Sequence, residues 1–340
     1  MANVYNNILE LIGQTPMLKL NEIVSEIPAK VYAKLEMFNP GHSVKDRIAL
    51  HIIETAEKKG LLKKGATIVE TTSGNTGFSL AMISVIKGYR CIVVVSDKTK
   101  PEKIAFLKTM GAEVYVCPAS VPADDPRSYY EVAKKIAKET PNSIYINQYF
   151  NELNVEIHYL TTGKEIWEQT EGKITHLVAC TGTGGTLSGS AKFIKEKNPN
   201  VKIIGIDADG SILKTYHETG EINPDEIHSY QIEGLGKNLI PDTVLFDKID
   251  EYVRVNDEDS AYMTREVALK EAILGGYTTG AVVQGLKQYA KENPFKESDV
   301  VVVIFPDHGS KYMTKVYSDD WMEEQGFTKN EAYKNEIIIK

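Results

Sequence analysis

Apolar positions along the chain follow two different periods, and segments of the two kinds alternate. Short runs of aliphatic and β-branched residues, typical of buried strands, are separated by segments in which apolar residues recur at helical spacing. The strand-like runs are residues 17–20, 31–35, 67–70, 91–95, 113–117, 176–180, 202–207 and 300–305. The helix-like segments are residues 45–60, 78–86, 101–110 and 129–138, the region around Glu165, the stretch that ends at Lys197, and residues 258–274 and 281–289. This alternation predicts an α/β protein with mainly parallel sheets flanked by helices.

A polar break at residues 147–151 separates the first set of strand–helix units from the second. A chain of 340 residues is long enough for two domains. We therefore predict a smaller N-terminal α/β domain over residues 40–150 and a larger α/β domain formed by residues 1–39 and 151–327, each built on a twisted, mainly parallel sheet. The polar segment 328–340 is predicted to be a tail, to which we assign no role. Residues 210–241 are predicted to be irregular, and a loop of that length inside a domain is usually functional.

Composition and charge narrow the range of functions. The chain has 47 acidic and 39 basic residues, a net charge of −8 and no long block of like charge, which disfavours a nucleic-acid partner. No apolar run approaches the length of a membrane span, so we expect no membrane partner. The first residues lack a signal-peptide pattern, and the three cysteines lack disulfide or CxxC spacing, so we expect a cytoplasmic protein. The seven histidines are scattered without a metal-site spacing, so we expect no metal.

A lysine stands in the first turn of a predicted helix. The turn Pro40-Gly41 is followed by Ser43, which can cap the helix, and by Lys45. The helix dipole disfavours a cation at this end, so Lys45 is under pressure to lose its proton and can become an amine nucleophile. A solvated surface lysine beside Asp46 and Arg47 is the alternative that this stretch alone favours.

Two polar loops join a predicted strand to a predicted helix. The first, residues 70–77, is rich in Thr, Ser, Asn and Gly, and the second is the glycine run at residues 182–186. Backbone N–H groups and hydroxyls at a helix start form an anion site, and glycines let the backbone approach a phosphate closely. Each loop alone is a weak signal, whereas both loops together with a helix-start lysine are a stronger one. A packing turn or a dinucleotide fingerprint is the alternative for the glycine run, but we find no acidic residue closing a suitable strand at the spacing that a ribose contact needs.

These motifs occur in the order found in a known family. The chain carries S-x-K-D-R at 43–47, T-S-G-N-T-G at 72–77, N-Q-Y at 147–149 and G-T-G-G-T at 182–186. Over residues 8–327 it resembles the β-family of pyridoxal-phosphate enzymes, the group of cysteine synthase and cystathionine β-synthase. The resemblance implies a fold like that of the tryptophan synthase β-subunit, with pyridoxal 5'-phosphate bound in the larger domain. It also implies small amino-acid and thiol substrates and a homodimer.

The resemblance implies a role for each motif residue. Lys45 carries the cofactor as a Schiff base and moves the α-proton of the substrate. The cofactor phosphate is held by Gly182, Thr183, Gly184, Gly185 and Thr186. The cofactor's 3-oxygen contacts Asn75, and the substrate carboxylate is bound by Thr72, Ser73, Asn75, Thr76 and Gln148, with Gly234 beside the substrate. For several of these residues, local turn capping is the alternative. Thr278 faces the pyridine nitrogen, where a hydroxyl cannot keep that nitrogen protonated, so β-elimination is favoured over transamination.

The loop Glu233-Gly234-Leu235-Gly236 is informative about the leaving group of the reaction. It is similar to the E-G-I-G of cystathionine β-synthases, where cysteine synthases more often have a neutral residue in place of Glu233. As a catalytic residue, Glu233 would assist the departure of hydroxide, a poor leaving group, and the alternative is a solvated loop residue. Lys237 and Tyr277 both depart from the family pattern, which leaves the acceptor thiol open.

The function that we expect is a β-replacement in sulfur amino-acid metabolism, with serine or an activated serine and homocysteine giving cystathionine. The alternatives are a cysteine synthase that uses O-acetylserine and sulfide, a cysteine-using reaction that releases hydrogen sulfide, and an inactive regulatory homologue. We expect neither the haem segment nor the regulatory domains that some family members carry.

Overall fold

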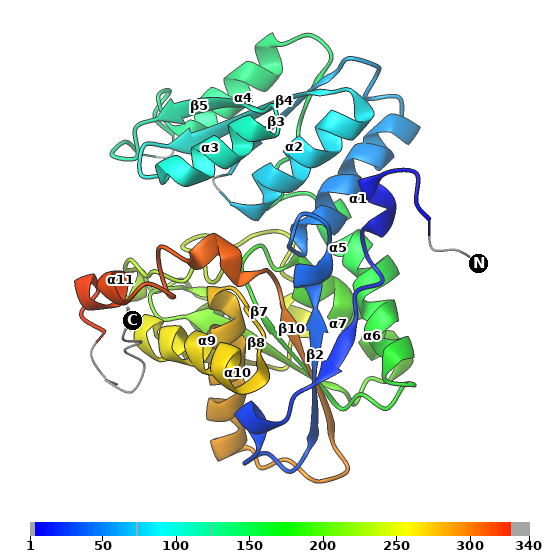
Figure 1. The fold of residues 1–340 in the computed structure, drawn as a ribbon, viewed down its shortest axis with the longest axis vertical. Coiled ribbons are helices and arrows are strands. Elements are labelled where there is room, and N and C mark those ends of the chain that lie inside the picture. The colour runs from blue at the N-terminus through cyan, green and yellow to red at the C-terminus, as the bar shows by residue number, and fades with distance from the viewer. Residues whose placement is uncertain (1–3, 73, 123, 328–340) are drawn as a thin grey trace, which may run out of the picture.

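The strands form two separate sheets (Figure 1). The computed structural model describes residues 4–72, 74–122 and 124–327. The larger sheet has the order β1-β2-β10-β7-β8-β9, and the smaller has the order β5-β4-β3-β6. The larger sheet consists of β1 (Met17–Lys19), β2 (Lys30–Leu35), β7 (His176–Cys180), β8 (Lys202–Ala208), β9 (Glu251–Val255) and β10 (Val300–Phe305). The smaller consists of β3 (Thr67–Thr71), β4 (Arg90–Ser96), β5 (Glu113–Cys117) and β6 (Ser143–Tyr145). Neighbouring strands are parallel except β1 and β2, which confirms the predicted α/β class.

Helices cover both faces of both sheets (Figure 1). Around the smaller sheet lie α1 (Lys45–Lys58), α2 (Asn75–Lys87), α3 (Pro101–Thr109) and α4 (Tyr129–Glu139). Around the larger sheet lie α5 (Leu153–Ile157), the π-helix His158–Gly163, α6 (Lys164–Gln169), α7 (Gly185–Lys197), α8 (Leu213–Thr219), α9 (Asp257–Glu271), α10 (Tyr277–Glu292) and α11 (Asp319–Glu324). Short 3₁₀ turns are Ile8–Leu11, Glu22–Val24, Glu36–Phe38, Pro224–Glu226, Phe246–Lys248 and Gly309–Tyr312.

Covering both faces explains why the central strands are continuously apolar. In β10, Val301, Val303 and Phe305 join the core beneath α9 and α10, whereas Val302 and Ile304 join the core beneath α6 and α7. Every residue of this strand is buried. A strand with one solvated face would instead alternate between apolar and polar side chains.

Among the elements that the sequence prediction missed are β6, β9, α8 and α11. Strand β6 is short and half-buried, and β9 lies at the edge of its sheet, so neither has the apolar run of a central strand. Helix α8 lies inside the stretch that we predicted to be irregular, and its first-turn amide at Lys214 donates to the carboxylate of Asp207 at the end of β8 (2.9 Å). Helix α11 is held by Trp321 and Met322, which are buried in the core of the larger sheet. Both helices are too short to be stable without such tertiary contacts.

The carboxyl ends of strands from both sheets point toward one region, where ligands bind in α/β folds. The loop after β3 carries Asn75, and the segment after β10 carries Asp307, and these two side chains are hydrogen-bonded. All strands of the smaller sheet fall within residues 40–150. The domain boundaries at 40 and 150 stay a prediction. In the described residues, no helix is both long and apolar enough to cross a membrane, and no group of His, Cys, Asp or Glu is arranged to hold a metal ion.

Candidate active site

Lys45 begins helix α1, as the sequence predicted. The hydroxyl of Ser43 accepts the Lys45 amide (3.3 Å), although Val44 and not Ser43 holds the cap position. The amide of Val44 donates to the Pro306 carbonyl (2.8 Å), which ties this end of α1 to the end of β10. The backbone contacts therefore hold Lys45 beside the residues that follow β10.

The surroundings of Lys45 favour its neutral amine. Burial, with repulsion from the Lys237 ammonium, lowers the pKa of Lys45 to about 8, even though the Asp307 carboxylate opposes this shift. The sequence argument named the helix dipole as the cause, whereas the structure makes burial the larger one. A lysine with such a pKa supplies a nucleophilic amine near neutral pH.

Asp307 is the centre of a polar cluster that the sequence analysis did not identify as part of the site. Its Oδ2 accepts hydrogen bonds from Asn75 Nδ2 (2.7 Å) and from the Tyr312 hydroxyl (2.8 Å). Lys311 Nζ donates to Asn75 Oδ1 (2.5 Å) and to the Gly41 carbonyl (3.0 Å). Burial raises the pKa of Asp307 despite the ammonium of Lys311. The Asn75 amide is thus held in one orientation, with its carboxamide plane fixed at both ends.

The glycine run after β7 has the features of a phosphate site. Helix α7 begins at Gly185 without a side-chain cap, so its first amides are available to an anion. Gly184 has φ +90°, and a Cβ there would lie 2.3 Å from Val244 Cγ2. On Gly182 a Cβ would lie 2.1 Å from the Gly234 carbonyl oxygen. Glycine is therefore required at both positions, and the loop of residues 182–186 lies directly against the Gly234 loop. Uncapped amides, two threonine hydroxyls and a nearby low-pKa lysine fit the phosphate and the aldehyde of pyridoxal phosphate.

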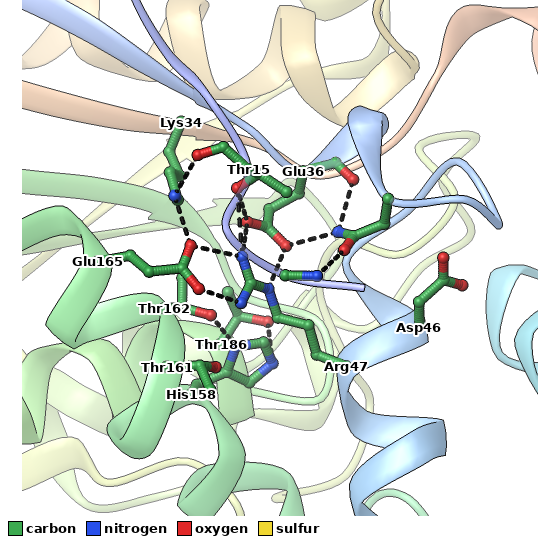
Figure 2. A network of polar contacts seen from close by, with 12 residues as sticks. Thr15, Lys34, Glu36, Asp46, Arg47, His158, Thr161, Thr162, Glu165 and Thr186 are labelled. Atoms are coloured by element: carbon green, nitrogen blue, oxygen red, sulfur yellow. Dashed lines mark hydrogen bonds and ion pairs between the residues drawn. The ribbon is translucent and has the colours of Figure 1, made fainter. Parts of the chain in front are cut away.

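A histidine supports the glycine run from behind (Figure 2). His158 is buried between two threonines: its Nδ1 lies 2.8 Å from Thr162 Oγ1, and its Nε2 lies 3.1 Å from Thr186 Oγ1. Burial and the Arg47 guanidinium lower the pKa of His158 to about 3. The imidazole is therefore neutral and orients the hydroxyl of Thr186. Sequence alone gave no sign of this role, because the spacing between His158 and Thr186 has no local meaning.

The predicted carboxylate-binding residues come together at the start of α2. Thr76 donates its hydroxyl hydrogen to Gln148 Oε1 (2.8 Å), and both side chains are buried. Thr72 Oγ1 accepts the Gly74 amide (3.1 Å) in the turn before the helix. Ser73, also predicted to bind substrate, lies outside the described residues. The contact between Thr76 and Gln148 brings two motifs that are far apart in sequence into one site.

Thr278 and Tyr277 begin helix α10 and have different surroundings. Thr278 is buried, and its carbonyl accepts the Cys180 thiol (3.4 Å), which places it at the end of β7 next to the glycine run. Tyr277 is a core residue: its hydroxyl donates to the Asp257 carbonyl (2.7 Å), and its ring packs edge-on against Trp321. The unusual residue at 277 is accommodated by the core and faces away from the chemistry.

Glu233 is neither a solvated residue nor a neutral acid. Its carboxylate forms ion pairs with Lys103, from α3 beside the smaller sheet, and with Lys315, which follows β10. Burial raises the pKa of Glu233, but the two ammonium groups outweigh burial and the net pKa is lowered. An ionised Glu233 does not donate a proton while both lysines remain paired with it. Its predicted catalytic role stays a prediction.

The alternative of a dinucleotide site needs one correction. An acidic residue, Asp207, does lie near the end of the strand after the glycine run. Its carboxylate is buried and accepts the amides of Ala208 (2.9 Å) and Lys214 (2.9 Å). Asp207 therefore holds the start of α8 and is not available to a ribose.

With the site assembled, its class follows from comparison with known proteins. Over residues 8–307 the chain matches the family described as "Pyridoxal-phosphate dependent enzyme". The chain belongs to this family, and the cofactor expected from the sequence is confirmed for it.

Within the family, the chain is close to cystathionine β-synthase and cysteine synthase. It is 44% identical over 328 residues to the cystathionine β-synthase of Apis mellifera, covering 96% of this chain and 64% of that protein. It is 39% identical over 317 residues to the cysteine synthase of Staphylococcus aureus, covering 93% of this chain and 98% of that one. The crystal structure of a hydrogen sulfide-producing enzyme from Fusobacterium nucleatum superposes with a TM-score of 0.82 at 35% identity, covering 92% of this chain and 99% of that one. The chain therefore spans less than two thirds of the honeybee relative but nearly all of the bacterial ones.

Proposed function

We propose that this protein catalyses β-replacement on serine or an activated serine with homocysteine as the acceptor, giving cystathionine. The observation that carries the proposal is a lysine amine with a pKa of about 8, in a chain whose two sheets are each followed by a helix start that lacks a side-chain cap and can bind an anion. Residues 182–186 hold the phosphate of the cofactor, and Thr72, Asn75, Thr76 and Gln148 hold the carboxylate of the donor. When bound, pyridoxal phosphate withdraws electrons from the α-carbon of the amino acid.

In the proposed reaction, Lys45 moves the α-proton of the donor, and a C–S bond replaces the C–O bond at the β-carbon. Lys45 takes the α-proton of the donor, and the β-oxygen leaves with the electron pair of the C–O bond. The thiol sulfur then forms the new C–S bond and loses its proton, and Lys45 returns a proton to the α-carbon. With serine and homocysteine the balance is cystathionine and water. Thr278, a neutral hydroxyl, is the partner that we propose for the pyridine nitrogen.

Departure of hydroxide needs a proton that acetate does not need. Glu233, with Lys103 and Lys315, is the group that we propose to supply it. Because Glu233 is ionised in the ligand-free site, donation requires that one of its lysines moves away or passes its proton through Glu233. Help of this kind is typically worth about 10²–10⁴-fold in rate.

The test is the substitution Glu233→Gln with serine and O-acetylserine compared as donors. The measurement is loss of the β-substituent without thiol, followed as a change in the visible absorption of the protein-bound cofactor. We expect the serine rate to fall by at least about 10²-fold and the O-acetylserine rate to change little. Equal loss with both donors would reduce Glu233 to a shaping role, and no loss with either would exclude it from the reaction.

The second candidate is the cysteine synthase reaction with O-acetylserine and sulfide, which the Staphylococcus relative supports. Release of hydrogen sulfide from cysteine is a variant that the Fusobacterium structure supports. Product analysis with each donor and each thiol decides among them. An inactive regulatory homologue is disfavoured because Lys45, Asn75 and the complete glycine run are retained.

We also propose that the protein acts as a homodimer in the cytoplasm. A groove on the side of α1 away from Lys45 is lined by the apolar residues Ile12, Leu50, Ile157 and Leu160, together with charged residues such as Arg47, Glu54, Lys164 and Glu168, and we propose it as the contact surface. Leu160 is 47% exposed. Light scattering of the wild type and of Leu160→Asp tests the dimer, which the substitution should weaken.

A further inference from the structure

Lys237 lies near Lys45. The resemblance to the family assigns no role to Lys237. Its backbone is fixed on both sides: its amide donates to Ser211 Oγ (2.8 Å), and its carbonyl accepts the Ile212 amide (2.9 Å). One residue earlier, the Gly236 amide donates to the Thr181 carbonyl (2.8 Å) at the end of β7. The loop that carries Lys237 is therefore attached to the base of the glycine run.

Among the described residues, the side chain of Lys237 has a neutral partner and no charged one. Nζ donates to the Tyr149 hydroxyl (3.1 Å) and lies 4.5 Å from the centre of the Tyr149 ring. Throughout the described part of the chain, no carboxylate forms an ion pair with it, although the side chain is half-buried. The other cleft lysines differ: Lys103 and Lys315 are paired with Glu233, and Lys311 donates to Asn75 and to backbone carbonyls.

Its location favours an anionic ligand at the substrate end of the site. Tyr149 directly follows Gln148, which contacts Thr76 of the carboxylate-binding loop. Lys237 is also close enough to Lys45 to repel its protonated form. A half-buried ammonium without a counter-ion gains most from a ligand carboxylate, because a charge-assisted hydrogen bond replaces lost hydration.

We propose that Lys237 and the Tyr149 hydroxyl bind the carboxylate of the acceptor, so that the acceptor is a thiol that carries a carboxylate and not sulfide. The donor has its own carboxylate site at Thr72, Thr76 and Gln148, and the cofactor phosphate has the amides of α7, so the acceptor is the one anionic reactant to which no binding group has yet been assigned. This inference rests on the proposed β-replacement. It names the residues that recognise the acceptor and the feature that they recognise, a carboxylate, as in homocysteine or cysteine.

The test compares thiols that differ only in the end away from sulfur. The probes are homocysteine, 4-mercaptobutanoate, which keeps the carboxylate and lacks the amine, and 3-mercapto-1-propanol, which is neutral. In Lys237→Gln we expect kcat/KM for both carboxylate thiols to fall by roughly ten- to a hundredfold, mainly through KM, and that for the neutral thiol to change less than about threefold. Lys237→Arg should recover part of the loss, and Tyr149→Phe should show a smaller loss with the same selectivity.

Lys192→Gln is the matched control, since it removes another lysine placed over a tyrosine ring, Tyr159 (5.2 Å), at an exposed position on α7. It should leave all three thiols unaffected. An equal loss with all thiols, or no loss with any, would overturn the proposal. So would a raised donor KM without thiol, which would assign Lys237 to the donor, or a reduced cofactor content, which would assign it to the phosphate.

Failure of the proposed function looks different. If wild-type protein with bound cofactor gives no product with any donor and thiol, the β-replacement itself is wrong. If product forms, but the loss of kcat/KM in Lys237→Gln is the same for thiols with and without a carboxylate, only the present inference fails. Circular dichroism and cofactor content of each variant exclude misfolding as the cause of a loss, and Tyr149→Phe remains as a test if Lys237→Gln does not fold.

Discussion

Helix α1 carries two cations two positions apart, and they lie in opposite electrostatic surroundings. Positions i and i+2 of a helix point to nearly opposite sides. Arg47 faces a closed network (Figure 2), in which it donates to Glu36 (2.7 and 2.8 Å) and to Glu165 (2.7 and 2.9 Å). Lys34 Nζ completes this network with bonds to Glu165 (2.6 Å) and to the Thr15 carbonyl (2.7 Å). Lys45, by contrast, lies near Asp307 and Lys237 and has no such network among the described residues.

The pKa shifts of the two sides differ in sign. In the Arg47 network, burial raises the pKa of Glu36, but the guanidinium outweighs burial and lowers it to about 2. On the other side, burial dominates: it lowers the pKa of Lys45 to about 8 and raises that of Asp307. Lys34 is the exception within the network, because burial lowers its pKa in spite of both carboxylates.

This difference separates scaffold from site. Where every charge has a partner, the charged forms are stabilised, and the network holds β2, α1 and α6 together. Where charges are buried without full compensation, the protein is poised to gain interactions from a ligand, and shifted pKa values of this kind cluster at functional sites. Neighbouring residues of one motif, Lys45-Asp46-Arg47, therefore perform different tasks.

The largest effect is expected from Lys45→Ala. Turnover should fall by more than about 10²–10⁴-fold, because the group that moves the α-proton is lost. The unfolding midpoint in urea should stay close to that of the wild type. The cofactor should still bind through residues 182–186. Turnover near the wild-type level would contradict the assignment, and borohydride reduction should fix cofactor to wild-type protein but not to the variant.

Arg47→Met should lower the free energy of unfolding, which Lys45→Ala should leave nearly unchanged. Removal of Arg47 leaves the fully buried Glu36 without its main counter-ion and leaves the half-buried Glu165 with Lys34 alone, and breaking a buried pair typically costs about 3–5 kcal/mol of unfolding free energy. The matched control is Arg90→Met, which breaks an Arg–Glu pair with Glu113 whose side chains are 46% and 45% exposed, and should cost no more than about 1 kcal/mol. If urea denaturation gave the same loss of unfolding free energy for both variants, the closed network would contribute no more to stability than an exposed ion pair.

The Arg47 network should also affect how the free energy of unfolding depends on pH in the acid range. Because the folded-state pKa of Glu36 is about 2 and the ordinary value is 4.5, its ionisation stabilises the fold above about pH 4.5. This contribution is lost as the pH falls from 4.5 toward 2. In Glu36→Gln, the decline of stability across this window should be shallower than in the wild type. Chemical denaturation at a series of pH values gives both slopes, and parallel curves would refute the prediction.

The smallest effect is expected at the pair that spans the two sheets. Lys103→Met removes one ion pair of Glu233, with side chains 23% and 31% exposed, and should change unfolding free energy by less than about 1 kcal/mol. If Glu233 passes a proton to the leaving group, the serine rate should change more than the O-acetylserine rate. A stability loss as large as that of Arg47→Met would place Lys103 in the scaffold instead.

Local pattern alone was enough for the central strands and for the motif loops. Strands such as β10 are continuously apolar because both faces are covered, and the glycine run at residues 182–186 is recognisable from its composition between a strand and a helix. The same local reasoning correctly placed Lys45 at a helix start. It could not place edge strands such as β9, because an edge needs fewer apolar side chains, nor α8, whose first turn depends on Asp207 from another element.

By itself, the sequence determined the class of fold and the motifs, since each depends on residues close together in the chain, and the cofactor followed from the family resemblance that the motifs carry. The tertiary structure alone decided which residues from distant segments complete the site: Asp307 beside Asn75, 232 positions apart, and His158 behind Thr186. It also decided that Glu233 is ionised and that Lys237 has no counter-ion among the residues that the structure describes. The physical reason is that charge states depend on burial and on partners brought together by folding, and no local spacing in the chain encodes either of them.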